Sequence, residues 1–421
     1  MRLALAGIAL LLAACAAQQP AAKMTSTGAP DWLPPYSAKQ LALLEPSNER
    51  VTDPASRTYP EMSRFRYARD RLLQDPRDAM RVTKIVADVV TQSPHTYTVA
   101  AAGPDVQNAV AQYGPPADAD PDAWVIAIAD RAGRKHLVPA KISDAAKRAY
   151  AEGQTLGGKQ DSAGAIAKLG EAALASPDVP ALHLALGKAF EASGDLARAE
   201  TAYREVIRAD TTLASGHSAL AALLVDKGDI PAARVSLAHA LAYHPTELQA
   251  LALAHKLAGR GQRIDAFAIF LEVDGVGVVR VAAAPTPGAR MYAGCRAVMR
   301  YEPELRRALF EQPTSEPYFL SVAEEMFCVE SAIGAYLAER AIAREEGKPE
   351  PDDEQTAALM NLAHTEGLLG FVMFEILGRY RPEHARAAPS FVHRATMGYV
   401  QRHVLGYDPG PDPSLNVAAL P

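Results

Sequence analysis

The fold is decided by the stretch PALHLALGKAFEASGDLARAETAY at residues 180–203, because its pattern recurs along the chain at a step of 34 residues. The positions that keep this step are Gly153, Gly187 and Ala221; Leu156, Phe190 and Leu224; Ala165, Ala199 and Ala233; and Leu169, Tyr203 and Leu237. Similarity at a fixed period indicates a repeated structural unit that stacks on its neighbours.

The residues of each unit predict two antiparallel helices. Small residues such as Gly187 and Ala199 let two helix backbones approach closely, and large residues fill the space beside them. Gly194-Asp195 and Gly228-Asp229 end the first helix and begin the second, since glycine accepts the left-handed conformation and aspartate is a good N-cap. Pro245 ends a helix and sets the turn to the next unit.

This pattern resembles the tetratricopeptide repeat family, which implies a right-handed α-solenoid. The units expected are residues 146–179, 180–213, 214–246 and 247–280, the fourth with one residue deleted. In the fourth unit the family positions fall on Leu253, Ala254, Leu257, Gly261, Ala266 and Phe270. Glu152 departs from the pattern, because a large apolar residue is usual there.

The resemblance also implies a binding groove lined by the first helix of each unit. By repeat phase its residues are Lys147, Tyr150 and Gln154; Leu184, Lys188 and Glu191; and Ser218, Ala222 and Asp226. Lys147 and Lys188 would hold an acidic group or a chain terminus, and Tyr150 would supply apolar area. The alternative is that these positions are only solvated helix faces.

The N-terminus predicts export. Arg2 is followed by an apolar run and then by Leu12-Ala13-Ala14-Cys15, which resembles the bacterial lipobox. The resemblance implies that residues 1–14 are removed and that Cys15 carries a lipid anchor. Ala16, in place of Asp, resembles outer-membrane sorting, so we expect a lipoprotein on the periplasmic side of that membrane. The alternative is an ordinary signal peptide cleaved near Ala17.

Between the anchor and the repeats the composition changes twice. Residues 15–35, rich in Ala, Gln, Pro, Ser and Thr, predict a flexible tether. Residues 36–145 predict a small helical or α+β region. In it, residues 64–91 have helical periodicity, residues 95–101 resemble a strand, and residues 124–141 have a β-hairpin pattern.

After the repeats we expect a linker at residues 285–288, a C-terminal helical domain at 289–408 and a tail at 409–421. Asp274-Gly275 predicts either a hairpin turn or the end of the last repeat helix. The overall expectation is a mainly α protein: a solenoid with an N-terminal α+β region and a C-terminal helical bundle.

Two cysteines remain beyond the lipobox, Cys295 and Cys328. In an oxidising compartment an even number of cysteines favours a disulfide. The alternative is two buried free thiols, because cysteine is a common core residue. Spacing alone does not choose between them.

The C-terminal bundle holds the residues that would suit an enzyme. They are Glu324, Glu325, Glu330, His364, Glu366, Glu375, His384, His393 and His403. Metal-binding bundles typically use Glu-x-x-His, which is absent among them, and Glu324 and Glu325 are expected on a solvated side. No phosphate loop, nucleophile elbow or zinc motif occurs either. We therefore expect no metal and no cofactor.

The net charge of −6 and the lack of basic runs argue against nucleic acid as a partner. The sequence predicts a lipid-anchored periplasmic scaffold that binds a protein or peptide of the cell envelope during assembly or secretion. The alternatives are an envelope enzyme with a metal or hydrolytic site in the C-terminal bundle, and a chain that self-associates through its solenoid. The oligomeric state does not follow from the sequence.

Overall fold

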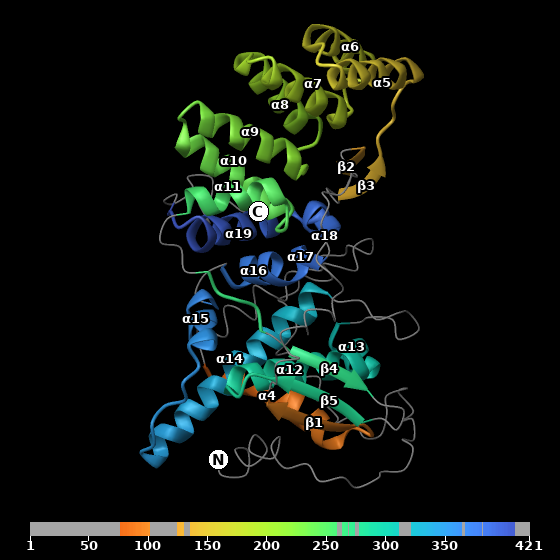
Figure 1. The fold of residues 1–421 in the computed structure, drawn as a ribbon. Coiled ribbons are helices and arrows are strands. Elements are labelled where there is room, and N and C mark those ends of the chain that lie inside the picture. The colour runs from red at the N-terminus through yellow and green to blue at the C-terminus, as the bar shows by residue number, and fades with distance from the viewer. Residues whose placement is uncertain are drawn as a thin grey trace, which may run out of the picture. The chain divides into compact units, whose positions relative to one another are not determined.

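The computed structural model describes residues 76–101, 124–129, 135–258, 263–267, 269–273, 278–310, 321–363, 367–380 and 382–408. These residues are mostly helical, which confirms the prediction of a mainly α chain (Figure 1). They belong to two units. Unit 1 combines residues 1–115 with 264–368, and unit 2 combines residues 116–263 with 369–421.

Helical hairpins make up most of unit 2, and each packs on the next along the chain (Figure 1). Their helices are α5 (Asp144–Gly158) and α6 (Ser162–Ala175), α7 (Pro180–Ala192) and α8 (Leu196–Ala209), and α9 (Ala214–Asp226) and α10 (Ile230–Tyr243). A single helix, α11 (Leu248–Leu257), follows. The three hairpins fall on the first three expected units.

The turn inside each hairpin is built from residues that recur every 34 positions. Asp161, Asp195 and Asp229 are the N-caps of α6, α8 and α10, and each side chain accepts a hydrogen bond from a backbone N–H three residues ahead. The residue before Asp195, Gly194, has a φ of 82°. The first hairpin has Gln160 there instead, with a φ of 63°. That conformation is unfavourable for a side chain with a Cβ.

Close packing inside each hairpin depends on small residues in its first helix. A Cβ added to Gly187 would lie 2.4 Å from Cε1 of Tyr203, and one added to Gly153 would lie 2.7 Å from Cγ of Leu169. Tyr203 itself is fully buried. A side chain at either position would force the facing residue of the second helix to move.

The fourth expected unit is wrong in its second half. The helix α11 ends at Leu257, Ala266 lies in an irregular segment, and Phe270 belongs to the strand β4 (Ile269–Val273). These residues form a strand rather than a repeat helix because β4 pairs antiparallel with β5 (Val278–Ala283), a segment rich in β-branched residues. Asp274-Gly275, where either a hairpin turn or a helix end was predicted, lies outside the described residues.

The rest of unit 2 comes from segments that precede and follow the repeats in the sequence. The predicted β-hairpin forms from β2 (Val125–Ala129) and β3 (Lys135–Pro139). The C-terminal segment contains η3 (Val372–Leu377), α17 (Gly378–Tyr380), α18 (Pro382–Ala387), α19 (Ser390–Tyr399) and η4 (Val400–Val404), where η marks π-helical turns. Both α18 and α19 pack on α10, and α18 also packs on β3.

Unit 1 is an α/β assembly. Its helices are α4 (Pro76–Gln92), α12 (Pro287–Tyr301), α13 (Pro303–Phe310), α14 (Val322–Glu346) and α15 (Glu354–Ala363), and α16 (Gly367–Phe371) begins in it. Its sheet has the order β1-β5-β4, with β1 (Thr96–Ala101) parallel to β5. The helix α12 packs on this sheet, and α4 and α12 pack on α14.

Two predicted domains are divided between the units. Residues 36–145 are not one region, because α4 and β1 belong to unit 1 whereas β2 and β3 belong to unit 2. The C-terminal domain at 289–408 is divided near residue 368. The expected linker at 285–288 contains the N-cap Thr286 and the first residues of α12. The boundaries of the two units are set by the pairing of segments that are distant in the sequence, and amino-acid composition does not predict such pairing.

The helix α14 shows clear end signals. Ser321 and Glu324 form a capping box at its start, and Gly347 ends it in the left-handed conformation. Among the described residues, no helix is both long enough and apolar enough to span a membrane.

Candidate functional site

The expected groove residues of the first hairpin lie at its surface. Lys147 and Gln154 are exposed, and the Lys147 ammonium lies 3.2 Å from the carboxylate of Asp144 in the same helix. Tyr150 is half-buried, because the ring of Trp124 packs edge-on against it with centroids 5.2 Å apart. Tyr150 therefore presents only part of its ring to solvent.

Two residues expected in the groove are buried. Leu184 belongs to the hydrophobic core that Phe190 and Tyr203 also form, and Ser218 has no exposed surface. The Ser218 hydroxyl donates to the carbonyl of Ser215. Packing covers the side of the helix on which each residue lies, so neither residue lines an open surface.

The other expected groove residues remain accessible. Lys188 and Asp226 are exposed, and Glu191 and Ala222 are half-buried. The Glu191 carboxylate accepts a hydrogen bond from the Tyr203 hydroxyl, and this bond joins α7 to α8. Lys188 on α7 is therefore a charged group of the expected face that points away from the core.

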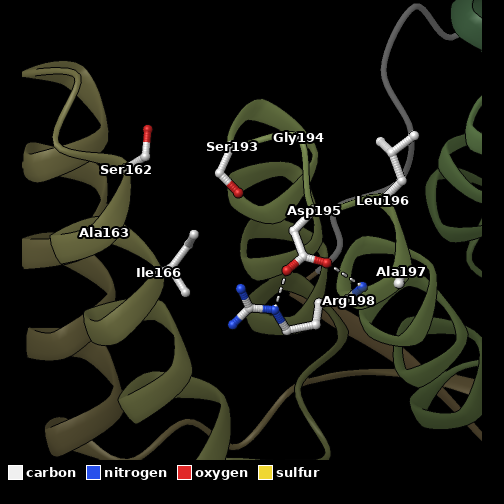
Figure 2. Close-up of a pocket in the computed structure, with 9 residues that line it drawn as sticks. All are labelled: Ser162, Ala163, Ile166, Ser193, Gly194, Asp195, Leu196, Ala197 and Arg198. Carbon is white, nitrogen blue, oxygen red and sulfur yellow. Dashed lines mark hydrogen bonds and ion pairs between the residues drawn. The ribbon is translucent and has the colours of Figure 1, made fainter.

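A cleft of about 880 Å³ lies elsewhere on the hairpins, between the start of α6 and the α7–α8 turn (Figure 2). Ile166 lines one side of it, and Asp195 with Arg198 lines the other. The Arg198 Nε lies 2.5 Å from Asp195, and its guanidinium stacks over the Phe190 ring. Since Asp195 and Arg198 are paired with each other, the lining of this cleft presents no unpaired charge to a ligand.

A stack of imidazoles lies inside unit 2. His217 on α9 stacks on His239 on α10 with ring centroids 5.0 Å apart, and Tyr243 stacks on His393 of α19 at 3.8 Å. His239 Nδ1 lies 3.1 Å from His393 Nε2. We call these four residues the imidazole stack. Burial lowers the pKa of His217 to about 4 and holds the pKa values of His239 and His393 below the usual range.

One member of the stack carries a signal that the repeat could have revealed. His217 Nε2 lies 2.9 Å from the carbonyl of Thr211, and His183, 34 residues earlier, lies 2.7 Å from the carbonyl of Pro177 in the same way. His393 was a candidate from the sequence, whereas His217 and His239 were not. The spacing of His183 and His217 would have marked the first of them.

A buried ion pair stands near the stack. Arg386 on α18 and Asp210, at the end of α8, are both essentially unexposed, and their charged atoms lie 2.7 Å apart. Arg386 also donates to the carbonyl of Val125, and Asp210 accepts from the N–H of Ala127. These two side chains thereby satisfy the backbone carbonyl of Val125 and the backbone N–H of Ala127 in β2.

The carboxylates expected on a solvated side are buried in unit 1. Glu324 and Glu325 have no exposed surface. Glu325 lies 2.8 Å from Arg296 Nε and accepts from the Tyr292 hydroxyl at 2.6 Å. Burial raises the pKa of Glu324 to about 7, against the attraction of Arg296 and Arg306. Adjacent positions at a helix start are covered here because α12 and α4 both pack on α14.

A second buried carboxylate in unit 1 gathers three donors. Glu302 Oε1 accepts from Ser93 Oγ and from the Tyr97 hydroxyl at 2.6 Å, and lies 2.9 Å from His95 Nδ1. The hydrogen bond to Glu302 raises the pKa of His95, whose ring is half-buried. A histidine oriented by a carboxylate through Nδ1 is the arrangement used by many general bases.

The other candidates of the C-terminal region are dispersed. Glu330 is buried on α14. Glu375 is buried in unit 2, where Arg263 binds both its oxygens and the Tyr399 hydroxyl donates to it. His403 stacks on Tyr399. His364 and Glu366 lie outside the described residues, and His384 lies on α18.

Within the described part of the chain, no three His, Cys, Asp or Glu side chains are placed to share a metal ion. Cys295 on α12 and Cys328 on α14 are joined by a disulfide, with Cα atoms 5.3 Å apart. Both residues are fully buried. The lipobox, Cys15 and the expected tether lie outside the described residues.

Comparison with known protein families, with curated proteins and with solved structures gave no match to this chain.

Proposed function

We propose that this chain is a lipid-anchored scaffold of the cell envelope, whose helical hairpins form a tetratricopeptide-type right-handed solenoid that binds a protein or peptide. One observation carries the proposal: equivalent residues recur every 34 positions in both the turns and the packing of consecutive hairpins. Asp161, Asp195 and Asp229 cap the second helices, and Gly153 and Gly187 admit Leu169 and Tyr203. Repeats of this kind typically serve as surfaces for protein recognition.

The face proposed to bind is the exposed part of the first helices. It contains Lys147, Gln154, Lys188 and Asp226, with Leu184 and Ser218 removed from the expected set because they are buried. An anchor at Cys15 would confine this face to a membrane surface and raise its effective concentration toward envelope partners.

Site-specific photo-crosslinking tests the scaffold function. A photoreactive residue at Lys188, on the proposed face, is compared with one at Arg204, an exposed position on the second helix of the same hairpin. We expect a defined envelope protein to crosslink at 188 and not at 204, and Lys188→Glu to abolish its recovery by an unmodified chain. Equal crosslinking at both positions would contradict the proposed face.

Lipidation is tested separately. The mature wild-type chain is expected to begin at Cys15 with acyl groups that mass spectrometry detects, and Cys15→Ala is expected to lose both the acyl groups and membrane attachment. An unmodified mature N-terminus near Ala17 would support the ordinary signal peptide instead.

An enzymatic function is the second candidate, and the arrangement of His95 and Glu302 favours it. A half-buried imidazole held by a buried carboxylate is suited to remove a proton from water or from a substrate hydroxyl. Hydrolysis of an ester panel by the wild type, lost in His95→Gln and retained in His136→Gln, would support this candidate. Equal rates for the three chains would argue against it.

A further inference from the structure

The imidazole stack joins segments that are far apart in the sequence. His217 and His239 lie on the third hairpin, whereas His393 lies on α19 in the C-terminal segment of unit 2. His393 stacks on Tyr243 and on His239, and the His239–His393 nitrogen contact of 3.1 Å adds a polar link. The stack is therefore part of what holds α19 against α10.

The charged groups around the stack oppose its protonation. Lys135 of β3 lies over the Tyr243 ring, 5.7 Å from its centroid, and Arg394 follows His393 on α19. The nearby carboxylate is Asp210, and it is engaged by Arg386 and by the hydroxyl of Thr212. A proton on one imidazole would also repel a proton on the next, because the rings are in contact.

Among the described residues, the buried face of His393 meets no acceptor for an added proton. Its Nδ1 is buried and has no hydrogen-bond partner among the described residues, while Nε2 faces His239. An imidazolium donates from both nitrogens, so the charged ring would bury an unsatisfied donor. Movement of α19 away from α10 would expose that donor to water.

We propose that the imidazole stack is a proton-operated latch, which holds α19 and η4 on the third hairpin near neutral pH and releases them in mildly acidic solution. The latch is independent of the proposed scaffold function, because it needs only the contacts inside unit 2.

The effect of pH on the closed state follows from the pKa values of the three imidazoles. All three imidazoles have pKa values below the ordinary 6.5, so the open segment binds more protons than the closed one. The closed state is unaffected above pH 6.5 and weakens as the pH falls from 6.5 toward 4. The buried His217 ring has a pKa of about 4. Its contribution alone makes an opening that exposes the ring about 30-fold more favourable at pH 5 than well above pH 6.5.

Amide hydrogen exchange of the full chain tests the latch. Protection factors are compared at pH 7 and pH 5 after correction for the intrinsic exchange rate. We expect protection in α19 and η4 to fall by about tenfold or more, while protection in α7 and α8 stays within about threefold. Unchanged protection in α19, or an equal loss in α7 and α8, would overturn the proposal.

The repeat supplies a matched control variant. His217→Gln removes a titrating ring from the stack, and His183→Gln removes the equivalent ring of the previous hairpin, which makes the same backbone contact outside the stack. His217→Gln is expected to make the fall in the α19 protection factors between pH 7 and pH 5 about tenfold smaller. His183→Gln is expected to leave that fall unchanged. An identical pH dependence in both variants would count against the latch.

A measurement on the wild type covers the case in which His217→Gln fails to fold. Proton–carbon NMR of the histidine rings reports each titration in the folded chain. His217 is expected to titrate near pH 4. Titration of the stack at the ordinary value of about 6.5, with α19 still protected, would overturn the proposal.

Discussion

The helical hairpins of unit 2 and the α/β assembly of unit 1 are held together by different kinds of contact. In the hairpins, Gly187 meets Tyr203 and Asp195 caps the next helix, so the partners are close in sequence. In unit 1, β1 pairs with β5, and Thr83 of α4 donates to the carbonyl of Ser331 on α14. Unit 1 is thus assembled from chain segments that precede and follow the hairpins in the sequence.

The interiors differ as well. The core of the hairpins is built from Ala, Leu, Val, Phe and Tyr side chains. Unit 1 buries Glu302, Glu324 and Glu325 with Arg296 and Arg306. Contacts between residues close in sequence close only short loops, so their cost in chain entropy is small. In unit 1, distant segments must come together, and the buried charges that they bring must be paired to offset their desolvation. Unit 1 should accordingly depend on its disulfide and on the protonation state of its buried carboxylates.

The largest effect is expected where unit 2 departs from its local apolar pattern. Arg386→Leu leaves the Asp210 carboxylate buried without its cation, which should cost about 3–5 kcal/mol. Urea unfolding followed by Trp124 fluorescence, in a Trp32→Phe background, measures it. The double variant Arg386→Leu, Asp210→Asn should recover part of the loss. A cost below about 1 kcal/mol would show that the ion pair is not needed.

The disulfide should be the main cross-link of unit 1. Replacing both Cys295 and Cys328 with Ala frees a loop with a sequence separation of 33 residues, which should cost about 3–4 kcal/mol. Hydrogen exchange in α12 and α14 should report the loss, with α7 and α8 as the internal reference. Two free thiols in the purified native chain, detected by mass with and without reductant, would refute the cross-link.

The two units should respond to pH in opposite directions. The pKa of Glu324 is about 7 in the folded chain, above its ordinary 4.5, so its burial costs little below pH 4.5 and increasingly more as the pH rises through 7. Glu324→Gln should stabilise unit 1 by about 2–3 kcal/mol at pH 8 and by much less at pH 4. Unit 2 should instead lose stability in acid through its imidazole stack.

Hydrogen exchange in α14 at both pH values measures this effect, with Glu350→Gln as the control. Glu350 is on the surface, where hydrogen bonds from Arg340 and Arg344 lower its pKa, so its replacement should give no gain at pH 8. A destabilised Glu324→Gln chain at pH 8 would mean that the carboxylate is stabilised by its arginine partners despite burial.

The hairpin packing predicts a pair of glycine variants with opposite signs. Gly187→Ala brings a Cβ within 2.4 Å of the Tyr203 ring and should cost about 1–3 kcal/mol. Gly170→Ala, inside α6 and with nothing within 4 Å, should gain about 0.5–1 kcal/mol. Chemical denaturation of unit 2 measures both. Equal effects would mean that close approach does not hold α7 to α8.

The smallest effect is expected at the first hairpin turn. Gln160→Gly replaces a strained left-handed residue by the one found at Gly194, and should gain about 1 kcal/mol, whereas Gly194→Gln should cost a similar amount. Thermal unfolding of the two variants measures the difference. A loss on Gln160→Gly would mean that the Gln160 side chain contributes contacts that outweigh its strain.

Several features were determined by the sequence alone. The period of 34 residues set the bounds of three helical hairpins, because caps, turn glycines and close contacts all act within one unit. The β-hairpin at residues 124–141 and the strand at 95–101 were also predictable from β-branched, alternating segments. In each case the deciding interactions are local.

Tertiary structure decided the rest. It turned the second half of the fourth unit into β4, because β5 lies beside it, and it added β1 to that sheet from far upstream. It also buried Glu324 and Glu325, covered Leu184 and Ser218, and gathered His217, His239 and His393. A sequence pattern shows which face of a helix is apolar. Which distant segment covers that face depends on the free energy of the whole assembly, and that is what placed the buried charges and imidazoles of this protein.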